Sequence, residues 1–169
     1  MRKTLFDSLT HRPFTEPLAL PADEELRQAA AQLDVATQRR LGRSLAIRVV
    51  DAGSCNGCEL ELNALSNPFY DLERFGLKIV ASPRHADVLL VTGPVTRNME
   101  QALRITFAAM PSPKWVVACG DCASCGGVFA ESPACLGGVA RILPVDIRLP
   151  GCPPPPAELL RGLVALMGR

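Results

Sequence analysis

Cysteine residues are the chemically most distinctive feature of this sequence. The 169-residue chain contains seven of them, an odd number, so they cannot all pair within the chain. Six fall in three short groups, which are Cys55 and Cys58, then Cys119, Cys122 and Cys125, and finally Cys152, whereas Cys135 stands apart. Grouped thiols of this kind indicate a metal centre or a redox-active dithiol.

The elements expected around these groups would bring them together. Short β-branched and aliphatic runs predict strands over residues 45–50, 77–81, 88–91, 115–118 and 145–149. Stretches between them predict helices over residues 59–65, 68–75, 98–110 and 157–167. The strands are apolar on both faces, which is typical of a parallel sheet covered by helices, so we expect an α/β fold.

The cysteine groups follow the first, fourth and fifth expected strands. Ligands of an open parallel sheet lie beyond the carboxyl ends of its strands, so thiols from three loops should meet at one edge. A [4Fe–4S] cluster needs four thiolates, one for each iron. The spacing therefore favours one such cluster, and Gly57 would allow the turn between Cys55 and Cys58 to be tight.

Two other interpretations of these thiols stay open from spacing alone. A four-cysteine zinc site would be a scaffold without a redox role, although Cys122 and Cys152 lie much farther apart than the C-x-x-C pairs that zinc sites commonly use. A thioredoxin-like dithiol at Cys55 and Cys58 would leave the cysteines at the other strand ends unexplained.

The second group, Cys119, Cys122 and Cys125, offers more thiols than one further site needs. Its three cysteines match the start of a bacterial ferredoxin motif, but the fourth ferredoxin cysteine would fall on Phe129. We expect Cys119 to end the buried strand, where a free cysteine acts as a small hydrophobe. Cys125 precedes two glycines and is expected to lie beside the centre without ligating it.

Composition excludes several classes of function. The net charge is +1 and aromatic residues make up 5%, which gives no support to nucleic-acid binding. No G-x-G-x-x-G or Walker A motif occurs, so NAD and ATP sites are not supported.

No secretory signal is visible, and no run approaches the roughly 18 apolar residues of a transmembrane helix. We expect a cytoplasmic protein, in which thiols stay reduced.

Residues 1–44 are expected to form an N-terminal extension, and residues 45–169 the cluster-binding domain. Residues 1–21 are rich in proline and irregular, whereas residues 22–42 predict a helix with acidic residues first and arginines last. Its apolar stripe consists of Leu26, Ala30, Leu33, Thr37 and Leu41. The stripe is expected to cover the core of this chain or to dock on a partner subunit.

From residue 51 onward the chain resembles the small subunit of energy-converting, membrane-bound [NiFe] hydrogenases of the formate hydrogenlyase type. That family is homologous to the complex I subunit that carries the terminal iron–sulfur cluster. The matching motifs are Asp-Ala-Gly-Ser-Cys-Asn-Gly-Cys-Glu-Leu-Glu (51–61), Asp-Leu-Glu-Arg-Phe-Gly (71–76), Ser-Pro-Arg-His-Ala-Asp-Val-Leu-Leu-Val-Thr-Gly (82–93), Cys-Gly-Asp-Cys-Ala-Ser-Cys-Gly-Gly-Val-Phe (119–129) and Pro-Val-Asp-Ile-Arg-Leu-Pro-Gly-Cys-Pro-Pro (144–154).

The resemblance implies a flavodoxin-like parallel sheet flanked by helices, with one [4Fe–4S] cluster on Cys55, Cys58, Cys122 and Cys152. The two residues between the first cysteines favour the hydrogenase branch, because complex I subunits have adjacent cysteines there. The family's Ser-Gly-Gly-like element has Cys125 in place of the serine.

The implied partners belong to a multisubunit oxidoreductase. They are a [NiFe]-hydrogenase-like or complex I-like large subunit, a ferredoxin-like iron–sulfur subunit, and membrane subunits that hold the complex at the inner face of the cell membrane. The chain would relay electrons to or from the large subunit and has no complete active site of its own. The alternative is a terminal-cluster subunit of a quinone or ferredoxin oxidoreductase.

Glu61 is the one further residue for which a chemical role is expected. It follows Cys58 by three positions, where the wider family often has glutamate, and it is expected to couple proton movement to the redox state of the cluster. The alternative is a solvated or interface carboxylate without that role.

Overall fold

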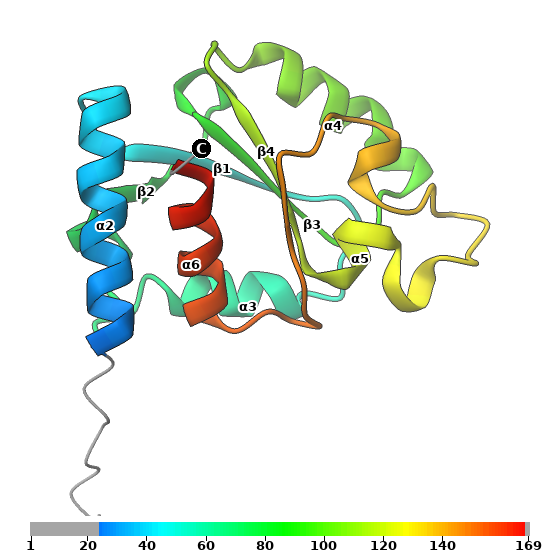
Figure 1. Ribbon diagram of the computed structural model, residues 1–169. Coiled ribbons are helices and arrows are strands. Elements are labelled where there is room, and N and C mark those ends of the chain that lie inside the picture. Colours follow the sequence, from blue (N-terminus) through cyan, green and yellow to red (C-terminus); the bar gives the residue numbers. More distant parts are fainter. Residues whose placement is uncertain (1–23, 168–169) are drawn as a thin grey trace, which may run out of the picture.

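The structure is a computed structural model that describes residues 24–167 (Figure 1). The Pro-rich segment 1–21, expected to be irregular, lies outside these residues. The strands are β1 (Leu45–Asp51), β2 (Leu77–Ile79), β3 (Val88–Thr92), β4 (Trp115–Cys119) and β5 (Ile147–Leu149). The α-helices are α2 (Glu24–Leu41), α3 (Gly57–Ala64), α4 (Arg97–Ala109), α5 (Gly120–Cys125) and α6 (Pro156–Met167).

The five strands form one parallel sheet in the order β2-β1-β3-β4-β5. This is the strand order of the flavodoxin-like doubly wound fold, and it confirms the fold class expected from the sequence. The register aligns the last residues of four strands in one row, in which Asp51 pairs with Thr92, Thr92 with Cys119 and Cys119 with Leu149. The loops that follow these strands therefore start from the same level of the sheet.

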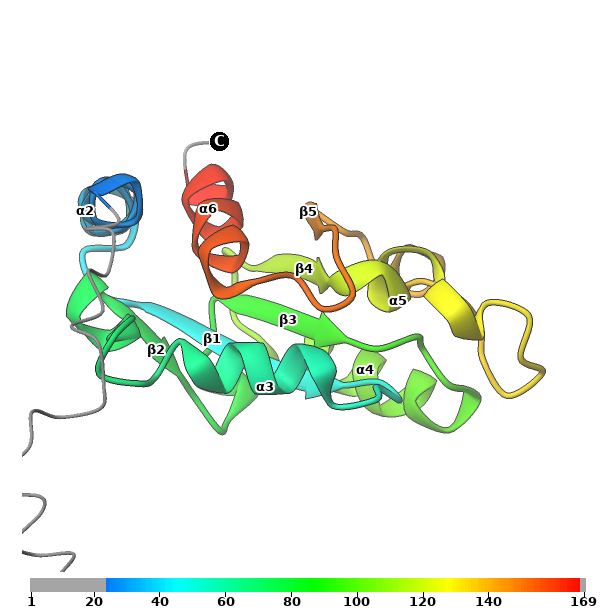
Figure 2. The ribbon, with the colours of Figure 1, turned by 90° about the horizontal axis from the view of Figure 1, so that it is seen from below.

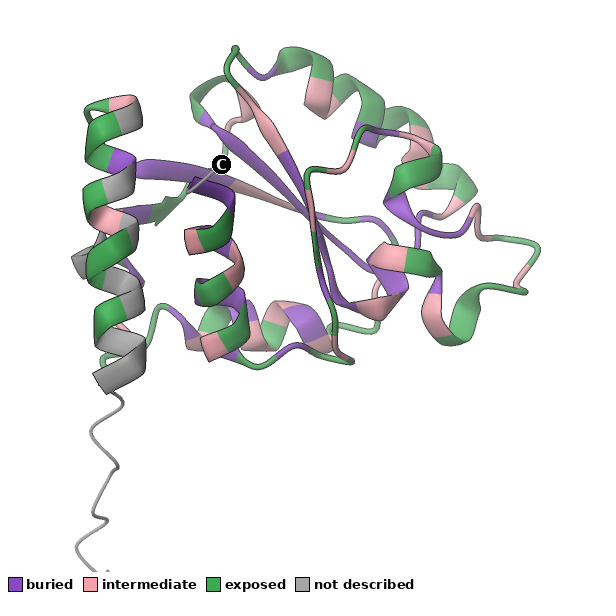
Figure 3. Cartoon of the chain, viewed as in Figure 1, coloured by how far each residue is buried: buried purple, intermediate pink, exposed green. Residues whose placement is uncertain are grey.

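Two clusters of buried side chains lie against the sheet. The first contains Leu62 of α3 and Leu159 and Leu163 of α6. The second contains Leu103 of α4 and Val139 of a short 3-10 turn. All five residues of β3 are buried, and Figure 3 shows the central strands mostly in the colour of buried residues. Figure 2 shows helices on both sides of the sheet.

Helix α2 confirms the helix predicted over residues 22–42 and lies beside α6 in both ribbon views (Figures 1 and 2). Thr37 is fully buried, and Leu41 packs against the first cluster, as expected if the stripe covers the core of this chain. The side chains of Leu26, Ala30 and Leu33 lie outside the described residues. The division of the chain at residue 44 stays a prediction.

One prediction of secondary structure is wrong, and one helix was not predicted. The helix expected over residues 68–75 is only a 3-10 turn, Leu72–Phe75, because Asn67 Oδ1 accepts hydrogen bonds from the backbone of Phe69 and Tyr70 and Asp71 has a left-handed backbone. No helix was expected where α5 directly follows β4. Among the described residues, no helix is long and apolar enough to cross a bilayer.

Candidate metal centre

The three predicted cysteine groups follow β1, β4 and β5, as expected, at the edge of the sheet where these strands end. Cys58 lies in the first turn of α3, and Cys122 lies in α5. Both of these side chains are buried, whereas Cys55 and Cys152 lie on exposed loops. All seven cysteines are free thiols, so none is used in a disulfide.

An aspartate-initiated turn shapes the loop that carries the first group. Asp51 Oδ1 accepts hydrogen bonds from the backbone N–H groups of Gly53 and Ser54, at 2.7 and 2.6 Å. Gly93, which follows β3, lies so close that a Cβ atom there would be 2.5 Å from the Ser54 nitrogen. Asn56 then adopts a left-handed backbone with φ of 70°, and α3 begins at the next residue.

Glycines leave room for the sulfur atoms of the two buried cysteines. A Cβ atom on Gly120 would lie 2.8 Å from Cys58 Sγ, and one on Gly127 would lie 2.8 Å from Cys122 Sγ. Both glycines have positive φ, at 86° and 51°. Any larger residue at either position would displace a thiol, so the backbone itself forms the wall against which these sulfurs pack.

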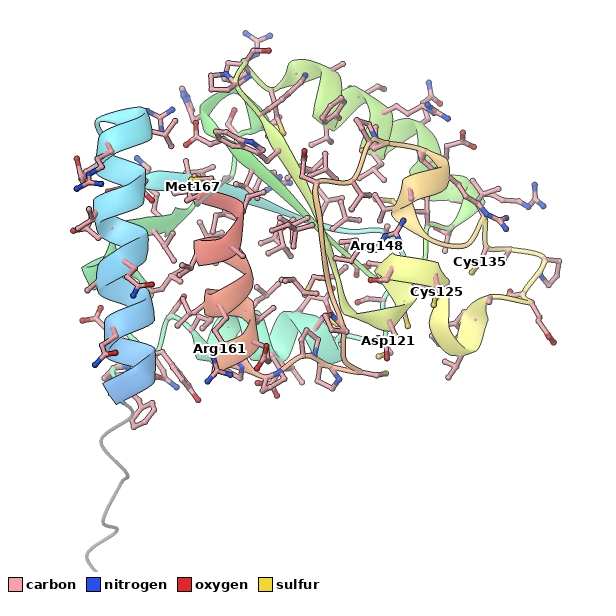
Figure 4. The ribbon with its side chains drawn as sticks, in the orientation of Figure 1. Asp121, Cys125, Cys135, Arg148, Arg161 and Met167 are labelled. Carbon is pink, nitrogen blue, oxygen red and sulfur yellow. The ribbon has the colours of Figure 1, made fainter. Side chains whose placement is uncertain are left out.

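Asp121 connects the second and third loops. Its backbone N–H donates to Gly151 O at 2.9 Å, and its Oδ1 atom accepts from Gly151 N at 2.9 Å. Figure 4 shows Asp121 on α5. The two bonds hold the residue before Cys152 against the residue before Cys122, so they set how these two thiols are placed relative to each other.

The pKa of the Cys122 thiol is shifted by its burial and by the other three cysteines. Burial raises this pKa, and the charges of Cys152, Cys55 and Cys58 raise it further by repulsion between like charges. The four cysteines that the family resemblance singled out therefore share one electrostatic environment. Within residues 24–167, no three His, Cys, Asp or Glu side chains form a group that would hold a single metal ion.

The remaining cysteines are placed differently. Cys119 ends β4 and is fully buried, which confirms its expected place in the strand. Cys125 is exposed, and its thiol donates to Asp121 O within α5 at 3.2 Å. Figure 4 shows Cys135 in the loop beyond α5, where it pairs with Thr96 in an isolated bridge.

Sequence reasoning missed Glu59, the acidic residue directly after the second cysteine. Thr92 Oγ1 donates a hydrogen bond to Glu59 Oε1, and the other carboxylate oxygen is buried without a hydrogen-bond partner in the described part of the chain. The pKa of Cys58 is lowered, chiefly by hydrogen bonding to Cys119, and the negative charge of Glu59 opposes that lowering. Glu61, the residue singled out from the sequence, is half-buried on the same helix.

Fold and site together define a class: a flavodoxin-like domain that presents four thiols at the carboxyl edge of its sheet. The family described as "NADH ubiquinone oxidoreductase, 20 Kd subunit" matches residues 55–166, from the first cysteine into the last helix. The chain belongs to this family, which confirms the resemblance noted from its motifs.

Two relatives are named as subunits of a membrane-bound hydrogenase and of formate hydrogenlyase. Over 124 residues the chain is 50% identical to the probable membrane-bound hydrogenase subunit mbhJ of Pyrococcus furiosus, which covers 73% of this chain and 74% of that protein. Over 152 residues it is 41% identical to formate hydrogenlyase subunit 7 of Escherichia coli, which covers 90% of this chain. The matched part spans only 58% of that longer relative.

Solved structures show the same fold. A chain of the membrane-bound sulfane sulfur reductase, an archaeal respiratory membrane complex, superposes with a TM-score of 0.67 at 34% identity, over 80% of this chain and 72% of that chain. A chain of an NAD⁺-reducing [NiFe]-hydrogenase in its H₂-reduced state superposes with a TM-score of 0.61 at 22% identity, over 75% of this chain and 93% of that chain. The second likeness concerns the fold alone.

Proposed function

We propose that this chain is the electron-transfer subunit of a [NiFe]-hydrogenase-like complex and holds one [4Fe–4S] cluster on Cys55, Cys58, Cys122 and Cys152. The observation that carries the proposal is that the cysteines follow β1, β4 and β5 at the one edge of the parallel sheet where these strands end. It supports four thiols from three loops that lie near one another. When bound, such a cluster takes up and releases single electrons.

The residues around the thiols fit this cofactor. Thiolates are the usual ligands of iron–sulfur clusters, and this edge supplies four of them from separate loops. The glycines at positions 120 and 127 leave the sulfurs of Cys58 and Cys122 free of side-chain obstruction. The buried pair would hold the inner side of the cofactor, and the exposed pair, Cys55 and Cys152, would hold the side that faces a partner.

The names of the relatives support the partner class. One is named a probable membrane-bound hydrogenase subunit and another a formate hydrogenlyase subunit. We therefore propose a large subunit with a nickel–iron site, a ferredoxin-like iron–sulfur subunit, and membrane subunits that bring the chain to the inner face of the membrane. A second candidate is the same relay in a complex I-like reductase of another substrate. The likeness to a chain of the sulfane sulfur reductase favours it. Nickel-binding cysteine pairs in the co-purified large subunit would decide between them.

The cofactor assignment is tested on the anaerobically purified complex. We expect absorption near ~400 nm and iron and sulfide in about equal amounts, whereas bound zinc with no colour would refute it. Serine at any of the four proposed ligands should abolish or weaken cluster binding. Cys135→Ser is the matched control and should retain the cluster, because Cys135 follows none of the three strand ends.

A role of Glu61 in proton coupling belongs to the same proposal. Its position on α3, one turn after Cys58, supports it. Glu61→Gln should flatten the dependence of the midpoint potential on pH while the cluster is retained. A pH dependence unchanged from that of the unsubstituted protein would leave Glu61 as an ordinary half-buried carboxylate.

A further inference from the structure

The crossover from β2 to β3 differs from the others in this fold. Its only helical element is the 3-10 turn Pro83–His85. This turn contacts α4, and Ala86 belongs to the second cluster, so the crossover lies on the face of the sheet that α4 covers. A parallel sheet of the doubly wound type usually has a helix in each crossover, packed on the sheet. Within residues 24–167, no α-helix connects these two strands.

The register shows which side chains lie on this face of β1 and β2. Leu89 of β3 pairs with Val116 of β4, and both are buried in the second cluster. Arg48 of β1 pairs with Leu89 and is only half-buried. Val80, directly after β2, is partly buried against the same cluster. The buried row under α4 therefore continues into a cation and a half-buried valine.

The cations on this face have no partner in the described part of the chain. Arg48 Nε is buried and has no hydrogen-bond acceptor there. Lys78 is exposed and lies on the same face, because side chains alternate along a strand and its neighbour Leu77 belongs to the first cluster on the other face. Neither Arg48 nor Lys78 forms an ion pair with a described residue.

Asp87, the carboxylate at the end of the crossover, is already occupied. Arg43 donates to its two oxygens at 2.8 and 2.6 Å, and Ala46 N donates to Oδ2 at 3.0 Å. Arg84, in the crossover turn, is a further exposed cation. The positive charge of this surface is therefore left for a group outside the described residues.

We propose that this basic face, formed by Arg48, Lys78, Val80 and Arg84, is an interaction surface for an acidic helix of a partner subunit. That helix would take the place of the missing crossover helix, with an apolar side chain against Val80 and carboxylates at the cations. The inference rests on the proposed function only in requiring a multisubunit complex.

The chemistry of the face favours a protein carboxylate. A guanidinium binds a carboxylate through two parallel hydrogen bonds, which are stronger than those between neutral groups. Recognition of anionic lipid surfaces commonly uses clusters of about 4–8 exposed Lys and Arg residues. This face offers fewer cations, and Arg48 is half-buried beside apolar side chains. A shaped acidic and apolar partner surface fits it better than a layer of headgroups.

Carbodiimide coupling of the intact, detergent-solubilised complex tests which group lies against the face. This reagent joins an amine directly to a carboxylate that is in contact with it. Mass spectrometry should find Lys78 joined to an Asp or Glu in a helix of a partner subunit. If Lys78 is not coupled to a partner subunit and vesicles of phosphatidylglycerol protect it from acylation, the face binds lipid and the proposal is wrong.

Charge substitutions test whether the contact contributes to assembly. Association is measured as the fraction of this chain that stays with the complex in gel filtration after serial dilution. Lys78→Glu should weaken it by about tenfold at low salt and by less at high salt, because like charges then face each other. Arg48→Met keeps the apolar stem but removes the charge and should weaken it similarly, whereas Arg48→Lys should weaken it less.

The matched control is Arg39→Glu, the same change of charge at an exposed residue of α2, which packs beside α6. It should leave association unchanged. Equal association of Lys78→Glu, Arg39→Glu and the unsubstituted chain would refute the proposal while leaving the cluster assignment intact. A complex without iron and sulfide that still yields the Lys78 coupling would refute the proposed cofactor and support the docking surface. Should Arg48→Met fail to fold, Lys78→Glu decides alone, because Lys78 is exposed.

Discussion

The side chain of Asp121 offers the sharpest test of how the site is built. Asp121→Ala removes the carboxylate that accepts from Gly151 N at 2.9 Å and leaves that part-buried N–H without its acceptor. A hydrogen bond to a charged group contributes about 1.5–3 kcal/mol, and partial burial places this one near the lower end, at about 2 kcal/mol. In a chain of this size that loss lowers the melting temperature by about 4–8 °C. Asp121→Asn retains Oδ1 as an acceptor and should cost less than about 1 kcal/mol.

The assay is urea or thermal unfolding followed by circular dichroism, together with the rate at which iron passes to a chelator. We expect Asp121→Ala to lose iron faster than Asp121→Asn, because the loop that carries Cys152 then loses one of the two hydrogen bonds between Gly151 and Asp121 and keeps the backbone bond. Equal effects of both substitutions would show that the negative charge matters and not the hydrogen bond. An alanine variant as stable as the unsubstituted protein would refute the reasoning outright.

Three further substitutions test the packing around the site and the sheet. Asp87→Ala should lower the free energy of unfolding by about 2–3 kcal/mol, because the 3% exposed carboxylate accepts from Ala46 N at 3.0 Å and that buried N–H would lose its acceptor; urea unfolding measures this. Gly127→Ala should reduce the iron content measured after purification, because its Cβ atom would lie 2.8 Å from Cys122 Sγ. Gly162→Ala should cost about 1–3 kcal/mol in the same unfolding assay, since its Cβ atom would lie 2.0 Å from a side chain of β5.

The sequence was sufficient to predict the fold because its strands carry an unambiguous signal. The aliphatic run predicted at residues 88–91 is a fully buried central strand, and the helix predicted after it, over residues 98–110, was correct to within about two residues. The two failures have different causes. In residues 68–71 an asparagine side chain bonds to the backbone and replaces the helical pattern, and in α5 a six-residue helix is too short to show a period.

The sequence could predict at which edge of the sheet the candidate thiols lie, but not the residues that support their loops. Cysteines can be recognised in the sequence by residue type and spacing, and the predicted end of each strand indicates where in the fold they lie. Asp121 was missed because its role depends on a contact with Gly151, which is distant in the sequence, and no local pattern encodes that pairing. Glu59 was passed over in favour of Glu61, because only the structure shows the hydrogen bond from Thr92.

The unequal burial of the four thiols has a consequence for how the potential should be measured. Cys58 and Cys122 are enclosed by core side chains and glycine backbone, whereas Cys55 and Cys152 are open to solvent. Val128, in the turn directly after α5, is 83% exposed. An exposed apolar side chain therefore follows Cys122 closely in the sequence. We expect the large subunit to cover this side and exclude water from it. Because solvent exposure is itself a determinant of cluster potential, a value measured on the separated chain should differ from that in the complex.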